Sequence, residues 1–582
     1  MTFLAPLRKA PALARPQPRP GLANLSDVIV LILIGATAVL VVHGVQQMNR
    51  PLSVLHQTPV SLDLARLPGY ALLTTMRMFA AIICSLIFTF VVGSLAAKSR
   101  KAAMVVVPAL DILQSVPVLG FLTFTVAFFL NLFPGKELGA ECAAIFAVFT
   151  AQAWNMAFSF YQSLRTLPGD LDEACRQFGL SPWRRFLRLE LPFAMPGLIW
   201  NTMMSMSGGW FFVVASEAIT VGDKTVTLPG IGSWLATAID HRDFGAVAWA
   251  VGAMGVVILL YDQLLFRPII AWADKFRFEQ TASQEAPSSW VYDLARRTRL
   301  MRTLLAPIGW AGRMLAAIEP PRLPRRPAPL PATADRALDW VWGALVVLVT
   351  VGVAVEAVRM LSRTLSLGDA LTALGLGGLT LVRVLVLIAV ASLIWVPIGV
   401  WIGLRPAWAE RVQPFAQFLA AFPANVLFPV AVIVISALHL NPDWALSPLM
   451  VLGTQWYILF NVIAGASALP TDLREVGAIF HVRSWQWWRQ IALPGIFPYY
   501  VTGALTASGG SWNASIVAEA VSWGNTRLEA HGLGAFISKA TTAGDLPRVG
   551  LGVAVMSLFV IALNRSLWRP LYGVAERRLR LD

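Results

Sequence analysis

Apolar stretches long enough to cross a lipid bilayer recur along almost the whole of this 582-residue chain. A membrane-spanning helix needs about 20 mainly apolar residues, because the hydrocarbon core is about 30 Å thick. Composition points the same way: apolar and aromatic residues make up 57% of the chain and charged residues 13%, whereas a soluble domain is about a quarter charged. The sequence predicts an all-α polytopic membrane protein and excludes a string of soluble domains.

We expect about twelve membrane-spanning helices. Proline removes a backbone hydrogen bond and bends a helix, so Pro117 and Pro423, each inside a predicted span, should produce kinks. The spans of the first half lie near 27–46, 70–97, 103–131, 140–163, 194–217 and 245–268. Those of the second half lie near 339–360, 376–403, 413–438, 443–467, 496–519 and 548–568.

The strong positive charge of the chain follows this topology. Its formal net charge is +14, and most of the 46 Lys and Arg residues fall in the termini and in the loops on the same side as the termini. Basic loops mark the cytoplasmic side of a membrane protein. We therefore expect both termini in the cytoplasm, a partner in membrane lipid, and no nucleic acid.

The two halves of the sequence are copies of one another. Arg77 and Arg383 are 306 residues apart, and Glu217 and Glu519 are 302 apart. Many other positions repeat at one of these two offsets. Since each half has six predicted spans, the repeats should be parallel, related by an axis along the membrane normal.

This repeat predicts two transmembrane domains, residues 1–270 and 338–582, joined by a cytoplasmic basic and Pro-rich linker, residues 271–337. The part of the linker between Pro320 and Pro331 contains six prolines, which favours a stiff extended spacer. Residues 290–310 mix apolar and basic side chains, which is typical of an amphipathic helix on the inner leaflet or of a solvated connector. Both interpretations stay open.

The chain lacks the sequence signatures of an energy-coupling or catalytic site. It has no GxxxxGK[ST] phosphate loop, no GxSxG elbow and no HExxH metal motif. Its three cysteines, Cys84, Cys142 and Cys175, do not form a disulfide framework. We therefore expect that the chain is not an enzyme and has no catalytic residue, metal or cofactor of its own.

The loops between the fourth and fifth spans carry the most specific motif. The first contains Glu173, Ala174, Gly179, Leu191 and Pro192, and the second contains Glu475, Gly477, His481, Leu493 and Pro494. Both resemble the EAA loop of ABC importer permeases, E-A-A-x3-G-x9-I-x-L-P. Together with Ser216-Glu217-Ala218, Gly230-Ile-Gly232 and their repeats, they are similar to nitrate/sulfonate/taurine-type permeases with two permease domains fused.

That resemblance implies a transport subunit with two parallel six-helix ABC importer permease repeats in a cell inner membrane. Each loop would dock on one of two ABC ATPase subunits, which hold the ATP, and an extracytoplasmic solute-binding protein would deliver the solute. The solute class implied is a small anion such as nitrate, a sulfonate or taurine, or bicarbonate. Because His481 replaces the motif glycine and Val476-Gly477 replaces Ala-Ala, we expect the two ATPase contacts to differ.

Charged residues inside the predicted spans are candidates for the pathway or its gate, since buried charge is costly in a membrane. They are Arg77, Glu217, Arg383 and Glu519. Three interpretations remain open: an Arg–Glu pair in each half that fixes the outer gate, arginines that draw in an anion, or side chains that reach the outer headgroups. A simple pair predicts that exchanging the charges of Arg77 and Glu217 restores function.

Two amides, Gln152 and Gln455, lie in the predicted fourth spans. They would either line the pathway or form hydrogen bonds between helices.

A secondary transporter with two six-helix parallel repeats is the alternative function. Such transporters commonly bury carboxylates or histidines that relay a coupling ion, whereas the acidic residues here lie near span ends. A membrane-embedded enzyme would need a nucleophile or metal constellation, which the sequence does not offer.

Overall fold

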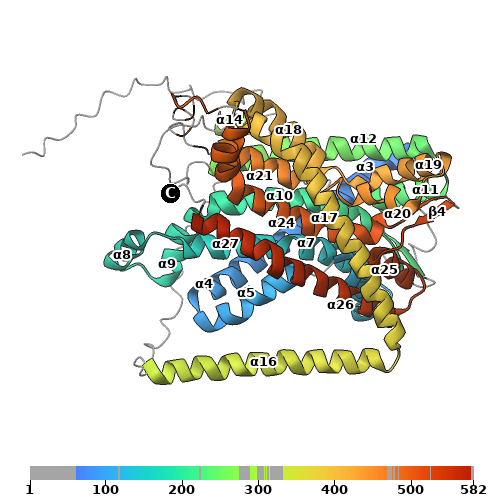
Figure 1. Ribbon diagram of the computed structural model, residues 1–582, viewed down its shortest axis with the longest axis horizontal. Helices are drawn as coiled ribbons and strands as arrows, with labels where there is room; N and C mark the ends of the chain where they lie inside the picture. Colours follow the sequence, from blue (N-terminus) through green and yellow to red (C-terminus); the bar gives the residue numbers. More distant parts are fainter. Residues whose placement is uncertain are drawn as a thin grey trace, which may run out of the picture.

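The computed structural model is a bundle of long helices (Figure 1). It describes residues 60–115, 118–221, 224–273, 289–297, 332–467, 484–524 and 526–578, with isolated positions between them. The predicted span 27–46, Pro117 and most of the 271–337 linker lie outside the described residues.

In the first half, a continuous helical segment runs from Leu64 to Lys98, formed by a 3₁₀ turn, α3 (Leu67–Phe88), a π-helical turn (Thr89–Gly93) and α4 (Ser94–Lys98). After it come α5 (Arg100–Ser115), α6 (Val118–Leu132), α7 (Leu138–Arg165), α8 (Gly169–Gln177), α9 (Pro182–Arg185) and α10 (Leu191–Glu217). The half ends with strands β1 (Ala218–Val221) and β2 (Lys224–Thr227), then α11 (Ile231–Asp240), α12 (Phe244–Tyr261) and α13 (Arg267–Ala273).

In the second half, the helices are α16 (Ala332–Ser362), α17 (Leu367–Gly403), α18 (Pro406–Ala421), α19 (Phe428–Ala437), α20 (Pro442–Ala445), α21 (Gln455–Ser467), α23 (Ser484–Trp487) and α24 (Leu493–Ala518). Strands β3 (Ala520–Trp523) and β4 (Thr526–Glu529) follow, then α25 (Leu533–Thr542), α26 (Leu546–Leu563) and α27 (Arg569–Arg578). The short helix α14 (Trp290–Arg297) belongs to the linker and packs on α13.

The prediction of an all-α polytopic fold is confirmed, with one small addition in each half. The strands β1 and β2 form an antiparallel hairpin that runs from the Ala218–Thr227 pair to the Val221–Lys224 pair, and β3 and β4 form its counterpart. Both hairpins directly follow the long fifth-span helix, so they cap the same end of the two repeats. π-helical turns also recur at matching places, Phe186–Glu190 with Trp488–Ala492 and Asp262–Phe266 with Asn564–Trp568.

Six helical segments of the described residues are long and apolar enough to cross a membrane, and a bent pair would make a seventh. Two predicted spans are wrong as single helices, while span 103–131 contains α5 and α6 with residues 116–117 outside the described residues. Span 443–467 is divided into α20, a 3₁₀ turn and α21. Span 413–438 stops at Ala421 and resumes after Pro423, since proline cannot continue the hydrogen-bond ladder.

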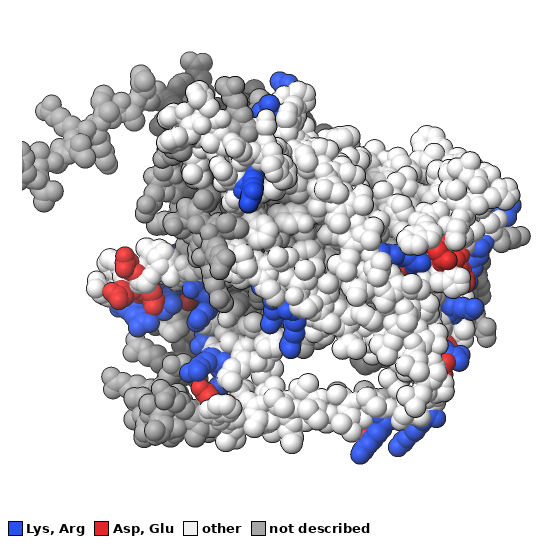
Figure 2. Space-filling view, viewed as in Figure 1, with Lys and Arg blue, Asp and Glu red and all other residues white. Residues whose placement is uncertain are grey.

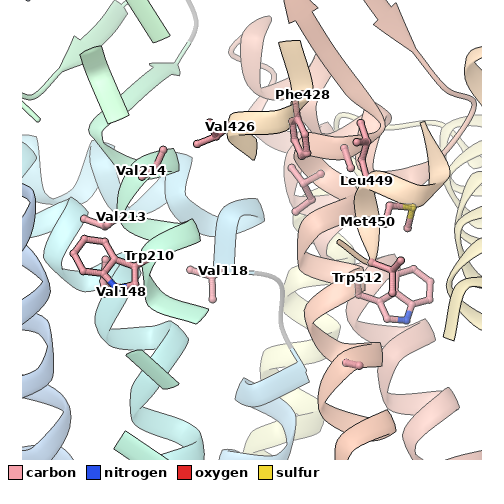
Figure 3. Close-up of a cluster of buried hydrophobic side chains, with 14 of the residues drawn as sticks. Val118, Val148, Trp210, Val213, Val214, Val426, Phe428, Leu449, Met450 and Trp512 are labelled. Carbon is pink, nitrogen blue, oxygen red and sulfur yellow. The ribbon is translucent and has the colours of Figure 1, made fainter. Parts of the chain in front are cut away.

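Helices of the two halves interlock. α18 packs against α10 and α12 of the first half, while α5 and α6 pack against α26 of the second. The buried apolar core includes residues from both halves, among them Trp210 and Trp512 in equivalent positions (Figure 3). At the same junction the Val118 amide donates a hydrogen bond of 2.6 Å to Asn513 Oδ1. The halves thus form one connected bundle.

Small residues allow the closest helix contacts. On α17, a Cβ added to Gly399 would lie 2.8 Å from Val462, and one added to Gly403 would lie 2.6 Å from the Ile463 carbonyl oxygen. Glycine permits this approach of α17 to α21, as is common where membrane helices pack.

The two ends of the bundle differ from its middle. α8 and α9 project from one end, while α11, α25 and β4 lie at the opposite end (Figure 1). Figure 2 shows charged side chains gathered toward both ends, with a wide uncharged surface between them. This distribution is what a bilayer requires of a protein that spans it.

Candidate functional site

A buried cluster of three charged side chains joins the helices of the first half near the β1–β2 hairpin. Arg77 on α3 donates from Nε to Glu141 Oε2 at 2.6 Å and from Nη2 to Glu141 Oε1 at 2.5 Å. Its Nη1 donates to Glu217 Oε1 at 2.7 Å and to the Pro229 carbonyl oxygen at 3.0 Å. The three charged side chains are at most 1% exposed. This arrangement fixes α3, α7 and α10 to one another.

The Gly-x-Gly motif holds the second carboxylate oxygen of this cluster. The Gly232 amide, in the first turn of α11, donates to Glu217 Oε2 at 2.7 Å. A helix N-terminus favours negative charge because its first amides have no partner within the helix. A Cβ added at Gly230 would overlap the Glu217 carboxylate, so glycine is required for the backbone to lie this close. The hairpin and α11 are thereby tied to α10.

The second half repeats the cluster in a looser form. Arg383 Nη1 lies 3.1 Å from Glu519 Oε1, and its Nη2 lies 3.5 Å from Asp443 Oδ1. The Asp443 side chain is 28% exposed and accepts a hydrogen bond of 2.6 Å from the His531 amide. Glu519 Oε2 accepts from the Gly534 amide at 2.7 Å. The same architecture is kept, with weaker contacts and partial access to solvent.

This geometry bears on the three interpretations of Arg77. Its guanidinium is enclosed by two carboxylates and a carbonyl and has no exposed surface. A side chain that reaches the headgroups would be exposed, and a receptor for an anion would not have two carboxylates already bound. The contacts favour the pairing of Arg77 with Glu217 within one half.

Sequence reasoning missed Glu141, Asp443, Thr74 and Thr380. Thr380 donates a hydrogen bond of 2.9 Å to Glu519, and Thr74 accepts one of 3.0 Å from the Ile231 amide. A signal for all four was present, because Glu141 and Asp443 are 302 residues apart and the two threonines are 306 apart. A search for polar residues that repeat at these offsets would have found the clusters.

The first predicted coupling loop is a helix, a turn and a second helix at the opposite end of the bundle. α8 contains exposed Glu173 and half-buried Ala174 and is followed by Gly179 at a φ of +63°. Ser181 then caps α9 by accepting a hydrogen bond from the Arg184 amide at 3.3 Å. Leu191 and Pro192 begin α10, where proline is tolerated because the first amides have no helical partner.

The second loop keeps the same turn without glycine. His481 has a φ of +50°, the left-handed conformation that Gly179 adopts and that costs a residue with a Cβ about 1–2 kcal/mol. Gly477 is buried and Glu475 is exposed, and Leu493 and Pro494 begin α24. The replacement of glycine by His481 therefore increases the backbone strain of the turn but keeps its left-handed conformation.

Each loop exposes a phenylalanine next to this turn. Phe178 is 82% exposed and Phe480 is 73% exposed, and the two occupy equivalent positions 302 residues apart. Exposed aromatic side chains on a projecting loop are typical of protein contact sites. Sequence reasoning did not select them, although the matched spacing was visible.

The surroundings of the two loops are not equivalent. In the first, Arg185 pairs with Asp172 and with Glu190, and Lys98 pairs with Glu190 at 2.7 Å. The equivalent positions in the second half hold no such set: Arg474, Trp487, Ala492 and Leu404. The first loop is braced by ion pairs that the second half does not encode.

The two amides differ in their environment. Gln455 Oε1 accepts a hydrogen bond of 2.9 Å from Trp395 Nε1 on α17, which is a contact between helices. Gln152 is fully buried against Gly209, and its amide has no hydrogen-bond partner among the described residues. Gly208 and Gly209 are closely packed, because a Cβ added at either would lie 2.6 Å from a neighbouring side chain, that of Tyr457 or that of Gln152.

Fold and loops together define a duplicated multi-pass membrane protein. Residues 89–267 and 395–580 each match the family described as binding-protein-dependent transport system inner membrane component. The chain belongs to this family, whose members are transport components.

Individual relatives match about one repeat each. The chain is 28% identical over 189 residues to the glycine betaine/proline betaine transport system permease protein ProW of Salmonella typhimurium, covering 32% of this chain and 49% of the relative. It is 27% identical over 186 residues to the bicarbonate transport system permease protein CmpB of Synechococcus elongatus (32% and 64%). It is 25% identical over 188 residues to the nitrate import permease protein NrtB of Synechocystis sp. (32% and 65%). The chain thus spans between about half and two thirds of these relatives.

Proposed function

We propose that this chain is the transmembrane permease subunit of an ATP-driven ABC importer in a cell inner membrane. One observation carries the proposal: two equivalent turns, at Gly179 and His481, both have a positive φ and an exposed phenylalanine beside them. Phe178 and Phe480 are the side chains that we assign to the contact with ATPase subunits.

Two loops per chain call for two ATPase subunits, on which ATP is bound and hydrolysed. The permease itself then needs no cofactor. The end that carries the loops is cytoplasmic in the predicted topology, as are both termini, and an extracytoplasmic solute-binding protein approaches the hairpin end. The ion-paired brace around the first loop makes the two ATPase contacts unequal.

The buried ion clusters act as braces within each half in this proposal. Arg77 and Arg383 each join the second, fourth and fifth spans of their own half. Each half then moves as a unit when ATP binding draws the loops together. The outer gate opens between the halves, without rupture of a buried ion pair.

The solute that we propose is a small anion, such as bicarbonate or nitrate. The support is the similarity to permeases whose names give these solutes. ProW, named for the zwitterions glycine betaine and proline betaine, supports a second candidate solute.

Uptake by vesicles that contain the chain and its ATPase subunits tests the function. We expect ATP-dependent accumulation of labelled nitrate or bicarbonate that requires the binding protein. Phe178→Ala combined with Phe480→Ala should abolish uptake while the permease remains folded. Uptake of glycine betaine in place of anions would overturn the solute assignment. Uptake driven by an ion gradient without any ATPase would establish the secondary transporter instead.

A further inference from the structure

A cavity of about 450 Å³ lies where the first half meets the second, between α10, α12, the turn after α12 and α18. Its apolar walls include Trp210 and Phe415, and its polar groups include Tyr261, Asp262, Arg267 and Arg411. Ligand sites in proteins commonly have this size, with apolar walls and a few placed polar groups. The cavity takes no part in the ion clusters or the loops.

One of the residues that line this cavity, Tyr261, has a buried hydroxyl group without a partner in the part of the chain that the structure describes. Tyr261 is only 8% exposed, and its ring packs on Phe79, Trp210 and Phe266. Its hydroxyl has no hydrogen-bond partner among the described residues. Leaving such a group unsatisfied costs about 1–3 kcal/mol, so a ligand atom that accepts or donates a hydrogen bond there would be stabilised.

Two arginines, Arg267 and Arg411, line the cavity and are accessible to solvent. Arg267 Nε pairs with Asp262 at 3.2 Å, and its side chain is 37% exposed. Arg411 is exposed and pairs with no carboxylate among the described residues. Both arginines belong to segments that the sequence predicts on the cytoplasmic side. One acidic and two basic side chains leave a net positive rim, which attracts a phosphate group.

The outer wall of the cavity is apolar and open. Phe415 is 62% exposed and Leu259 is 50% exposed, on helices that cross the apolar part of the bundle. In a bilayer these side chains face acyl chains. A ligand that fits must therefore combine an anionic head with an apolar tail.

The duplication supplies an internal comparison. At the equivalent positions of the other half, Tyr261 becomes Leu563, Asp262 becomes Asn564 and Arg411 becomes Val105. Phe415 becomes Ala109. Arg267 keeps an arginine, Arg569, at the equivalent position. Tyr261, Asp262 and Arg411 are therefore not required by the permease fold itself and are particular to this one junction.

We propose that this cavity binds one anionic phospholipid of the inner leaflet, with its phosphate at Arg267 and Arg411, its polar head near the Tyr261 hydroxyl and its chains along Phe415. Because α10 and α12 belong to the first half and α18 to the second, the bound lipid contacts both halves. The inference goes beyond the proposed transport function and depends only on the location of the chain in a membrane.

Binding to the purified, delipidated full chain tests the proposal. Native mass spectrometry would compare phosphatidylglycerol with phosphatidylcholine of the same acyl chains. We expect one tightly bound phosphatidylglycerol, and Arg411→Gln should weaken its binding about tenfold, as loss of a charged hydrogen bond does. Tyr261→Phe should weaken it severalfold. Arg405→Gln, which changes an exposed arginine stacked on Trp401 outside the cavity, should have no effect.

Three results would overturn the proposal. These are equal binding of the two lipids, binding that Arg411→Gln and Tyr261→Phe leave unchanged, and displacement of the lipid by inorganic phosphate, which would assign the site to a free anion. If Arg411→Gln does not fold, Tyr261→Phe decides, since it removes only one oxygen atom. The assay contains no ATP, ATPase or transported solute, so its result is separate from that of the uptake experiment.

Discussion

Arg77 and Glu217 lie 140 residues apart in the sequence, yet their Nη1 and Oε1 atoms are 2.7 Å apart and neither side chain is exposed. Glu141 binds the same guanidinium through both of its oxygens. A charge buried without a partner is strongly unfavourable. The cluster therefore stabilises the packing of α3, α7 and α10 as a single unit.

Removal of Arg77 should destabilise the protein more than removal of Arg383. Arg77→Met leaves two buried carboxylates without their partner, at a cost of about 3–5 kcal/mol. Arg383→Met leaves Asp443 with its His531 contacts and partial exposure to solvent, so its cost should be smaller. Thermal unfolding in detergent should give a lower midpoint for Arg77→Met. Equal midpoints would show that the shorter contacts of the first cluster add nothing to the stability of the protein.

Exchange of the charges of Arg77 and Glu217 should fail to restore stability or uptake. A glutamate at position 77 would face Glu141, and an arginine at position 217 would face the Gly232 amide, which donates rather than accepts. A two-residue pair would be rescued by this exchange, whereas a cluster of three charges with a backbone donor would not. Recovery of the parental unfolding midpoint in Arg77→Glu/Glu217→Arg would contradict the cluster.

Gly232→Ala should be destabilising and Gly252→Ala should not. A Cβ on Gly232 would lie 2.8 Å from the Val214 Cα atom and against the Glu217 carboxylate, while one on Gly252 meets nothing within 4 Å. Alanine in an open helical position is favoured over glycine by about 0.5–1 kcal/mol. The two variants, compared by thermal unfolding, should shift the midpoint in opposite directions. An unchanged or raised midpoint in Gly232→Ala would show that the Val214 backbone and the Glu217 carboxylate move aside without cost.

Replacement of His481 by glycine should relax the second loop. The φ of +50° at His481 costs about 1–2 kcal/mol, which outweighs the entropy cost of about 0.5–1 kcal/mol that glycine brings. His481→Gly should therefore slow hydrogen exchange in the turn, and the matched change Gly179→His should speed it in the first loop. Faster exchange in His481→Gly would show that the histidine side chain makes a compensating contact.

Much of the fold could be predicted from the sequence because a bilayer imposes long apolar helices. Offsets of 306 and 302 likewise reveal the duplication in the sequence. The same offsets connect Glu141 with Asp443, but the sequence does not show that Glu141, an acidic residue near a span end, has Arg77 as its partner. Only folding places these residues together, because the contact joins positions 64 residues apart.

Helix breaks were harder to predict. The sequence predicts that Pro423 bends a span, and it separates two helices instead. Between α20 and α21, Pro448 lies at the start of the 3₁₀ turn Ser447–Met450 and a further turn precedes Gln455, whereas hydropathy predicts a single span there. The shape of the second turn also follows from tertiary structure, since His481 has a weak intrinsic preference for positive φ.

The composition of the purified complex tests the central claim most directly. Native mass spectrometry of the chain expressed with its ATPase should give one permease chain with two ATPase subunits. Phe178→Ala and Phe480→Ala should each reduce the number of bound ATPase subunits to one, and the double variant should retain no ATPase subunit. A permease chain that purifies without an ATPase and imports its solute on an ion gradient would contradict the account.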